Sequence, residues 1–181
     1  MLQQFRQWFT FFFIPIFPTG RPTGEHVQCQ TCHSRFRPEI LTTPTSAQLT
    51  SGLAAAMRVA AVAMVKAGGA LDSAARQAAV AAITQAGTPD YAEAQLQHDL
   101  DAGDVSALPA YLAPLANGLS LPGKENFVAK IVEIGKADGP LSPDERMVVG
   151  SIGAALGLSG AHIEGIVVTA GSATRASDET A

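Results

Sequence analysis

Cys29 and Cys32 are the only cysteines of the chain, and two residues separate them. This spacing is typical of two thiolates on one metal ion, and it suits a stabilising long-loop disulfide less well. A structural zinc ion takes four ligands, of which this pair supplies two. His33 is a poor fourth ligand because it directly follows Cys32, and His26 reaches the metal only if the turn bends toward it. The sequence therefore predicts an incomplete zinc site at Cys29 and Cys32.

The segment from Cys29 to His33 also has the five-residue pattern that attaches c-type haem, with His33 as the axial ligand. Haem attachment needs export, a pocket and usually a second axial ligand. The neighbouring aromatic segment and linker offer none of these, so an exported haem protein is the alternative hypothesis. A thioredoxin-like redox role is weaker still, because no βαβ pattern surrounds the two cysteines.

Three carboxylates lie around a glycine-containing turn at residues 136–146. Asp138 and Glu145 are spaced so that both could approach one hard cation, and oxygen ligands suit calcium, magnesium or manganese. The alternative is structural, because residues 142–145 (Ser-Pro-Asp-Glu) have the pattern of a capping box with proline at the first helical position. Two or three carboxylates are few for a calcium site. We therefore expect at most a weak divalent-cation site at Asp138 and Glu145.

No residue set has the pattern of a catalytic centre. His98 and His162 lie in segments with helical periodicity, and neither is accompanied by a serine or cysteine nucleophile with an orienting acid. The glycine pair at 68–69 lacks the surroundings of a phosphate-binding loop. We therefore expect a protein that is not an enzyme.

Helical periodicity follows a cluster of threonine, proline and serine and continues to about residue 170. Apolar residues recur at one and two helical turns, for example at Leu53, Met57 and Met64. We count about seven helices, which predicts a mainly all-α protein. The helical domain at 48–170 is expected to follow a linker at 43–47 and to precede a flexible tail at 171–181.

Glycine, proline and serine mark the expected ends of these helices. Gly87 and Gly157 each follow an apolar helical segment, as glycine does at a helix C-terminus. Thr88-Pro89 is expected to open the helix after Gly87, and Ser159 to open the last helix.

An internal repeat is the most informative feature of this region. Residues 66–71 and 136–141 share lysine, alanine, glycine and leucine in register, seventy positions apart, and Arg76 then matches Arg146. Each copy ends one apolar helix and starts another. A repeated helix-turn-helix predicts a duplicated unit whose two halves pack face to face around a common core.

The segment 136–146, its weaker counterpart 66–76 and the helix count resemble the TerB-like tellurite-resistance family over about residues 48–170. In that family each half carries an Ala-Asp-Gly turn and an acidic helix start, and the acidic turns are regarded as metal-binding. Its members belong to stress-response systems and are not known as enzymes. The resemblance implies metal ligands at Asp138 and Glu145. In the first copy Gly68 replaces the aspartate and Ala75 the glutamate, so half of a shared acidic site is missing.

Residues 8–41, with Phe-Phe-Ile-Pro-Ile-Phe-Pro at 12–18 and one Cys-x-x-Cys, resemble the second half of a bacterial zinc-ribbon family. Members of that family have another Cys-x-x-Cys before the apolar strand. The resemblance implies a partial zinc ribbon at 1–42, with one or two short strands from Phe9 to Phe17. Three alternatives are open: a true start upstream of Met1 that adds the missing pair, an empty decayed ribbon, or a homodimer that pools cysteines from two chains.

Charge and hydropathy limit the partners of this chain. Residues 1–45 carry a formal charge of +2 and residues 46–181 carry −6, and an acidic helical body is a poor nucleic-acid partner. The apolar run from Trp8 to Phe17 has ten residues and contains Pro15, whereas a membrane-spanning helix needs about 20 residues. The cysteine pair fits a reducing compartment. We expect a cytoplasmic protein with no membrane anchor.

Together these patterns predict a non-enzymatic protein in which a partial zinc ribbon precedes a duplicated helical domain. It is expected to bind metal, or to act as a stress-response interaction protein with an unidentified protein partner. An exported electron-transfer protein with c-type haem and a metal-free structural scaffold are the alternatives.

Overall fold

The computed structural model describes residues 2–4, 8–11, 14–18, 25–28, 30–36, 46–70, 72–102 and 104–178, with side chains at 28, 30–35, 47–70, 72–102 and 104–170. The chain divides into two compact units, Met1–Pro44 and Thr45–Ala181. The first contains strands and the second contains helices.

The first unit contains antiparallel strands. The strand β2 (Trp8–Phe11) pairs with β3 (Ile14–Pro18). The strands β1 (Leu2–Gln4), β4 (Glu25–Gln28) and β5 (Arg35–Phe36) form a sheet in the order β1-β4-β5. Aromatic and β-branched residues favour extended backbone, and the strands expected between Phe9 and Phe17 are present as β2 and β3.

The second unit is helical, and among the described residues it has the seven α-helices that the periodicity predicts. They are α1 (Ser46–Ala67), α2 (Ser73–Gln85), α3 (Glu93–Ala102), α4 (Leu108–Gly118), α5 (Leu121–Gly135), α6 (Pro143–Ala155) and α7 (Gly160–Asp178), with a short 3-10 helix η2 (Val105–Ala107) before α4. The mainly all-α prediction is therefore confirmed for this unit. The helix α7 continues to Asp178, into the segment 171–181, and the flexibility expected of that segment stays a prediction.

The helix α1 is the centre of the helical core. It packs against α2, α4, α5 and α6. Ala56, Ala60 and Ala61 are fully buried, and their small side chains let neighbouring helices approach closely. By length and composition α1 is the one described helix that is apolar enough to cross a membrane, over Ala47–Ala67, but this helix also supplies many of the buried core residues.

The internal repeat is present in the structure. The helices α2 and α6 have 13 residues each and start seventy positions apart. Asp72 caps α2 and Ser142 caps α6 at matching positions. The glycines also match: Gly69 and Gly139 follow α1 and α5, Gly87 and Gly157 follow α2 and α6, and all four have positive φ angles. Positive φ favours glycine, so each pair fixes the same turn in both copies.

Of the two expected helix starts, the one at Ser159 is confirmed and the one at Thr88-Pro89 is wrong. Ser159 precedes α7 and its hydroxyl accepts a hydrogen bond from the His162 backbone N–H, as predicted. Thr88-Pro89 does not open a helix, because the Tyr91 N–H donates to the Thr88 carbonyl in a turn and α3 begins only at Glu93. The Gly87 and Gly157 helix ends are confirmed.

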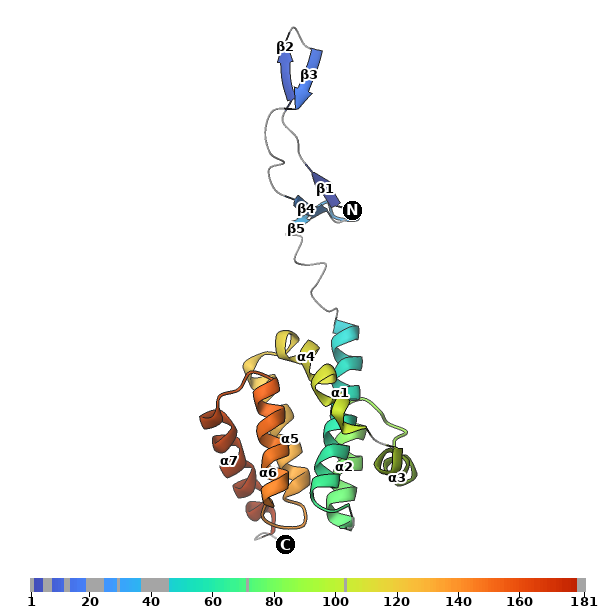
Figure 1. The fold of residues 1–181 in the computed structure, drawn as a ribbon, viewed down its shortest axis with the longest axis vertical. Coiled ribbons are helices and arrows are strands. Elements are labelled where there is room, and N and C mark those ends of the chain that lie inside the picture. Colours follow the sequence, from blue (N-terminus) through green and yellow to red (C-terminus); the bar gives the residue numbers. More distant parts are fainter. Residues whose placement is uncertain are drawn as a thin grey trace. The chain divides into compact units, whose positions relative to one another are not determined.

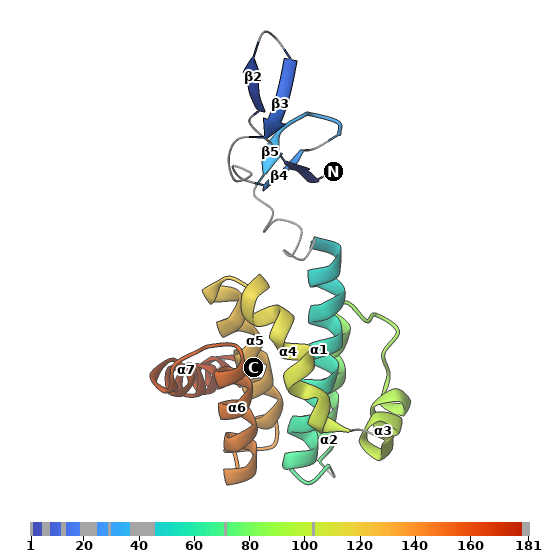
Figure 2. The same cartoon turned by 45° about the horizontal axis from the view of Figure 1, so that its top comes forward.

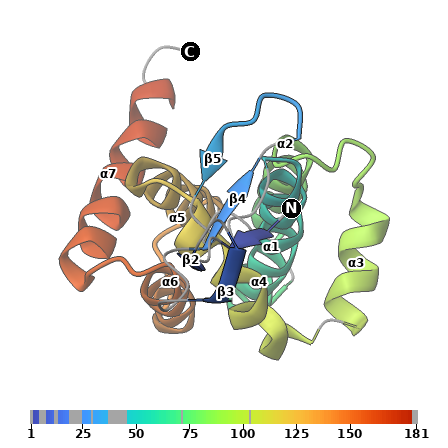
Figure 3. The same ribbon diagram turned by 90° about the horizontal axis from the view of Figure 1, so that it is seen from above.

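The two halves of the repeat differ in their third helix. The helix α7 has 19 residues and packs along α5, whereas α3 has 10 residues and makes fewer contacts with α1. Figures 1, 2 and 3 show α3 and α7 on opposite sides of the helical unit. The shorter α3 leaves part of α1 uncovered.

Candidate functional site

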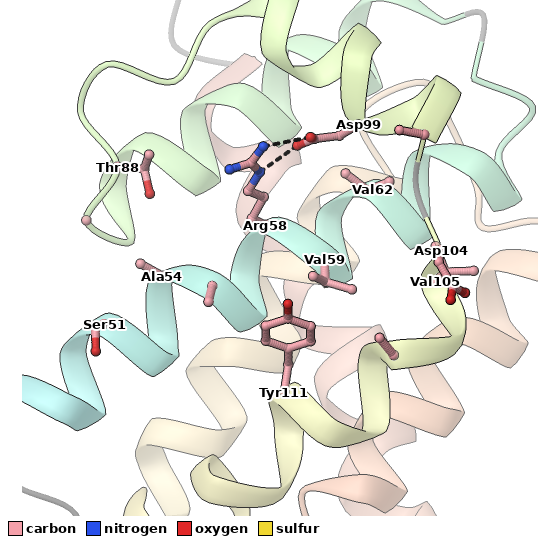
Figure 4. A pocket seen from close by; sticks show the side chains of 14 residues that line it. Ser51, Ala54, Arg58, Val59, Val62, Thr88, Asp99, Asp104, Val105 and Tyr111 are labelled. Atoms are coloured by element: carbon pink, nitrogen blue, oxygen red, sulfur yellow. Dashed lines mark hydrogen bonds and ion pairs between the residues drawn. The ribbon is translucent and has the colours of Figure 1, made fainter.

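An open cavity of about 690 Å³ lies between α1, α3 and α4, beside η2. One face of α1 forms its floor, with the small side chains of Ala54, Ala55 and Val59. Figure 4 shows Thr88 and Asp99 on one side of this floor and Tyr111 of α4 on the other. We call this cavity the α1 groove. Its volume lies within the range of about 300–1,000 Å³ that ligand-binding pockets occupy.

A network of three side chains connects α3 to α1 at the groove. Nε and Nη2 of Arg58 each donate to a carboxylate oxygen of Asp99 at 2.6 Å. The Tyr91 hydroxyl donates to the same carboxylate at 2.6 Å, and its ring lies 5.2 Å from the Arg58 guanidinium carbon. Two parallel hydrogen bonds fix the plane of a guanidinium group. Arg58 is therefore held in one orientation in the wall of the groove.

The network shifts the ionisation of its members. Hydrogen bonds from Arg58 are the largest cause that lowers the pKa of Asp99, and the same bonds raise the pKa of Arg58. Burial is the largest cause that raises the pKa of Tyr91, followed by its hydrogen bond to Asp99. At neutral pH the network thus contains a carboxylate, a guanidinium and a neutral phenol.

Arg58 keeps donors for a further acceptor. The Nη1 atom makes no hydrogen bond to any described residue, and Figure 4 shows this nitrogen turned away from Asp99, on the side of Thr88. The Arg58 side chain is 44% exposed. A bound group with an oxygen atom can therefore accept from Nη1 without breaking the Arg58–Asp99 pair.

The rim of the groove combines exposed apolar side chains with carboxylates. Val105 is 37% exposed and Tyr111 is 42% exposed. Asp104 lies beside them at the start of η2, where its carboxylate accepts from the Ser106 backbone N–H at 2.9 Å. Hydrogen bonding to Ser106 lowers the pKa of Asp104, so this group is ionised at neutral pH.

In the acidic turn predicted as a cation site, Glu145 is buried and Asp138 is exposed. Glu145 is 4% exposed, and its Oε2 accepts from the Ser142 backbone N–H at 2.7 Å while the Ser142 hydroxyl accepts from the Glu145 N–H. The capping box expected from the sequence is therefore confirmed. Asp138 is exposed in the turn before α6.

The second carboxylate oxygen of Glu145 faces the first repeat. A Cβ atom added at Gly68 would lie 2.8 Å from Oε1, and one added at Gly135 would lie 3.4 Å from it. No described residue donates a hydrogen bond to Oε1. Gly68 stands where the resemblance to the TerB-like family implies an aspartate. This position therefore lies next to Glu145 of the other repeat. This contact crosses between the repeats, which the linear spacing does not show.

The residues next to Glu145 Oε1 provide few ligands for a cation. A calcium ion takes about six to eight oxygen ligands, and Gly68 and Gly135 have no side-chain oxygen. Among the described residues, no group of three or more His, Cys, Asp or Glu side chains is arranged to hold a metal ion. The residues present fit one carboxylate ligand and not a full coordination shell. The site at Asp138 and Glu145 stays a prediction.

The cysteine pair is described in part. Cys29 lies outside the described residues, and Cys32 is exposed with its Sγ 3.3 Å from the Ser34 hydroxyl. The register of β4 and β5 places residues 29–34 between the paired ends Gln28 and Arg35. His33 has a φ of 57°, the left-handed conformation of a tight turn.

The two helical histidines are surface residues. His98 is exposed on α3, and His162 is exposed at the start of α7, where Nδ1 lies 3.4 Å from the Ser159 hydroxyl. Neither lines the α1 groove.

Sequence reasoning missed Arg58, Tyr91 and Asp99. Arg58 and Asp99 are 41 positions apart, and no short motif connects them. One signal was available: Arg58 is the only charged residue between Ser46 and Val65, in an otherwise apolar helix. A single charge on such a helix indicates a specific partner, because an unpaired buried charge is costly.

Comparison with known proteins identifies a family for the helical unit. No curated protein and no solved structure matches the chain. The family described as tellurite resistance protein TerB matches residues 54–166, within the 48–170 expected from the resemblance. This match covers more than half of the chain, and it contains the α1 groove residues Arg58 and Asp99 together with the acidic turn at Glu145. The chain therefore belongs to the TerB family.

Proposed function

We propose that this protein acts by binding, not by catalysis, in a stress response of the tellurite-resistance type, and that it binds its partner in the α1 groove. The observation that carries this proposal is the open cavity of about 690 Å³, with Arg58 held in its wall by Asp99. Preformed pockets with a few fixed polar groups are typical of binding sites.

The composition of the groove supports binding without catalysis. Its described lining includes the hydroxyl groups of Ser51, Thr88 and Tyr111 but no cysteine or histidine side chain. A hydroxyl nucleophile needs an adjacent general base, most often histidine. The one carboxylate near Arg58, that of Asp99, is already used by two hydrogen-bonding partners.

A variant that fills the groove tests this proposal. Ala55→Trp places a large ring on the groove floor, and Ala81→Trp is the control, because Ala81 is exposed on α2 and does not line the groove. Each variant is expressed in cells that lack their own copy, and survival is measured on potassium tellurite. We expect Ala55→Trp to abolish protection and Ala81→Trp to retain it. Full protection by Ala55→Trp, with unchanged circular dichroism, would contradict the proposal.

Zinc binding by the first unit is the second candidate, and the β4–β5 pairing favours it. The pairing of Val27 with Phe36 and of Gln28 with Arg35 closes a hairpin in which Cys32 is exposed in the turn. We propose that Cys29 and Cys32 bind zinc with two cysteines of a second copy, in the reducing cytoplasm. Zinc in such a site would be structural, because four protein ligands leave no open position.

Metal content of the purified full chain tests the zinc proposal. We expect about one zinc per two chains by mass spectrometry, dimers by sedimentation, and loss of both in Cys32→Ser. Asp138→Ala is the matched control and should retain zinc. A visible absorption band that is lost in Cys32→Ser would instead indicate haem at residues 29–33. A monomer without metal would contradict zinc binding.

A further inference from the structure

The internal repeat shows which face of α1 is left open. Residues of α5 lie seventy positions after those of α1, so Ala55 corresponds to Glu125 and Val59 to Ala129. Glu125 and Ala129 line a shared cleft with Gly165 and Ile166 of α7. In the second half α7 lies against this face and leaves a cleft of about 410 Å³. In the first half the shorter α3 leaves the larger α1 groove, which Ala55 and Val59 line.

The α1 groove has the length and the small floor side chains that can accommodate a helix. On α1 the groove extends from Ser51 to Val62, which is about 16 Å or three helical turns. Its floor has small side chains, so a second helix can approach α1 closely. Val105 and Tyr111 add exposed apolar surface at the rim, next to the floor. An amphipathic helix that lies in an apolar groove uses this kind of surface.

Charge around the groove favours a basic occupant. Residues 90–104 contain five carboxylates and no lysine or arginine. Arg76 pairs with Glu93 and Arg58 with Asp99. Of the other three, Asp104 lines the groove, and hydrogen bonds to Ser106 followed by the charge of Lys66 lower its pKa. Asp90 and Asp101 are exposed but do not line the groove.

This charge also argues against a second copy as the occupant. The region 46–181 carries a formal charge of −6, so a helix from another copy of this unit would meet like charge at the rim. A small anionic ligand would meet the same repulsion. A helix with lysine or arginine beside its apolar stripe is attracted to the same rim.

We propose that the α1 groove binds a basic amphipathic helix of a partner protein, which takes on α1 the place that α7 takes on α5. This inference rests on the proposed function and specifies the partner. The apolar stripe of the helix lies on Ala54, Ala55 and Val59. Its basic side chains reach Asp104, which lines the groove, and Arg58 Nη1 donates to an oxygen of the helix.

Designed peptides provide the test. The probe is a fluorescent peptide of about 18 residues, with leucine and alanine at helical spacing and lysine on both flanks, long enough to form a marginally stable helix. One matched peptide has glutamate in place of every lysine, and another has the same composition in scrambled order. Binding to the full chain is measured by fluorescence anisotropy at about 50 mM and about 300 mM salt.

We expect the lysine peptide to bind at least about tenfold more tightly than either matched peptide, and to weaken at high salt. Ala55→Trp should weaken it by about tenfold or more, and Ala81→Trp should leave it unchanged. Asp104→Asn should reduce the salt dependence more than Asp101→Asn, because Asp101 does not line the groove, and asparagine at 104 retains the cap of η2. If Ala55→Trp does not fold, Tyr111→Ala replaces it, with a loss of about threefold to tenfold expected.

Several outcomes would overturn this inference. Equal binding of the glutamate or scrambled peptide excludes recognition of a basic amphipathic helix. Self-association of the protein that Ala55→Trp abolishes assigns the groove to a second copy. If no peptide binds but Ala55→Trp still abolishes survival on tellurite, the proposed function stands with another kind of ligand. If the lysine peptide binds but survival does not depend on the groove, the proposed function fails.

Discussion

Replacing Asp99 by alanine tests whether the polar network holds α3 against α1. Asp99 accepts hydrogen bonds at 2.6 Å from Arg58 and from Tyr91, whose side chain is buried. The Tyr91 hydroxyl would lose a charged acceptor away from water, which costs about 1.5–3 kcal/mol. Arg58 is 44% exposed, so water replaces its partner and the ion pair adds only about 0–1 kcal/mol. We expect Asp99→Ala to lower the free energy of unfolding at pH 7 by about 2–3 kcal/mol.

The partner variants separate these contributions. Tyr91→Phe removes the donor and leaves Asp99 paired with Arg58, so it should cost about 1–2 kcal/mol. The double variant should cost less than the sum of the two single variants by about 1–2 kcal/mol, because one hydrogen bond is counted in both. Urea unfolding is followed by far-ultraviolet circular dichroism, because the only tryptophan, Trp8, lies in the other unit. Purely additive effects, or a cost of Asp99→Ala below about 0.5 kcal/mol, would refute the reasoning.

The same variant predicts how stability changes with pH. Because Arg58 lowers the pKa of Asp99 in the folded chain, the folded state binds this proton less readily than the unfolded state, where the pKa is about 3.9. The stabilisation is therefore complete above about pH 4 to 5 and is lost as the pH falls through the lower folded pKa. Tyr91 and His98 also contribute to this lowering. The difference in stability between the native protein and Asp99→Ala should be constant from neutral pH to about pH 5 and shrink below pH 4.

Two further predictions concern helix packing and capping. Gly153→Val should lower stability by about 1–3 kcal/mol, because an added Cβ would lie 2.6 Å from Ile163 of α7. In Gly150→Ala, on the same helix, the added Cβ meets no atom within 4 Å, so this variant should raise stability by up to about 1 kcal/mol in thermal melts. A Gly153→Val variant more stable than Gly150→Ala would contradict the α6–α7 contact. Ser142→Ala should cost about 1 kcal/mol through loss of the α6 cap. Glu145→Ala should cost about 2 kcal/mol or more, because it also empties a buried site. Equal costs of Ser142→Ala and Glu145→Ala in urea unfolding would show that the burial of Glu145 contributes nothing.

The features that the sequence predicts well are those with a local physical cause. Gly87 and Gly157 occupy positive φ because a helix end in this conformation disfavours a Cβ atom. Ser142 and Glu145 form the capping box because both partners lie within one turn of backbone. Matching signals seventy positions apart are therefore sufficient to find the duplication, the helix count and the family.

Features that depend on tertiary packing were not predictable in this way. Thr88-Pro89 has the residue types of a helix start, yet the chain forms a turn there and α3 begins at Glu93. The orientation of α3 depends on Arg58 and Asp99, which only the folded chain brings together. The acidic turn shows the same limit, since the capping role of Glu145 is local but its proximity to Gly68 is a contact between repeats.

Divergence between the two repeats explains why the groove is in the first half. Arg58 corresponds to Val128 and Asp99 to Thr169, so an ion pair between α1 and α3 stands where α5 and α7 have a buried valine and a threonine. A polar bridge can hold two helices at one point without close packing along their length. The longer α7 instead packs along α5. The duplication thus supplies two corresponding faces: the face on α5 packs along α7 beside a smaller cleft, and the face on α1 lines the larger groove.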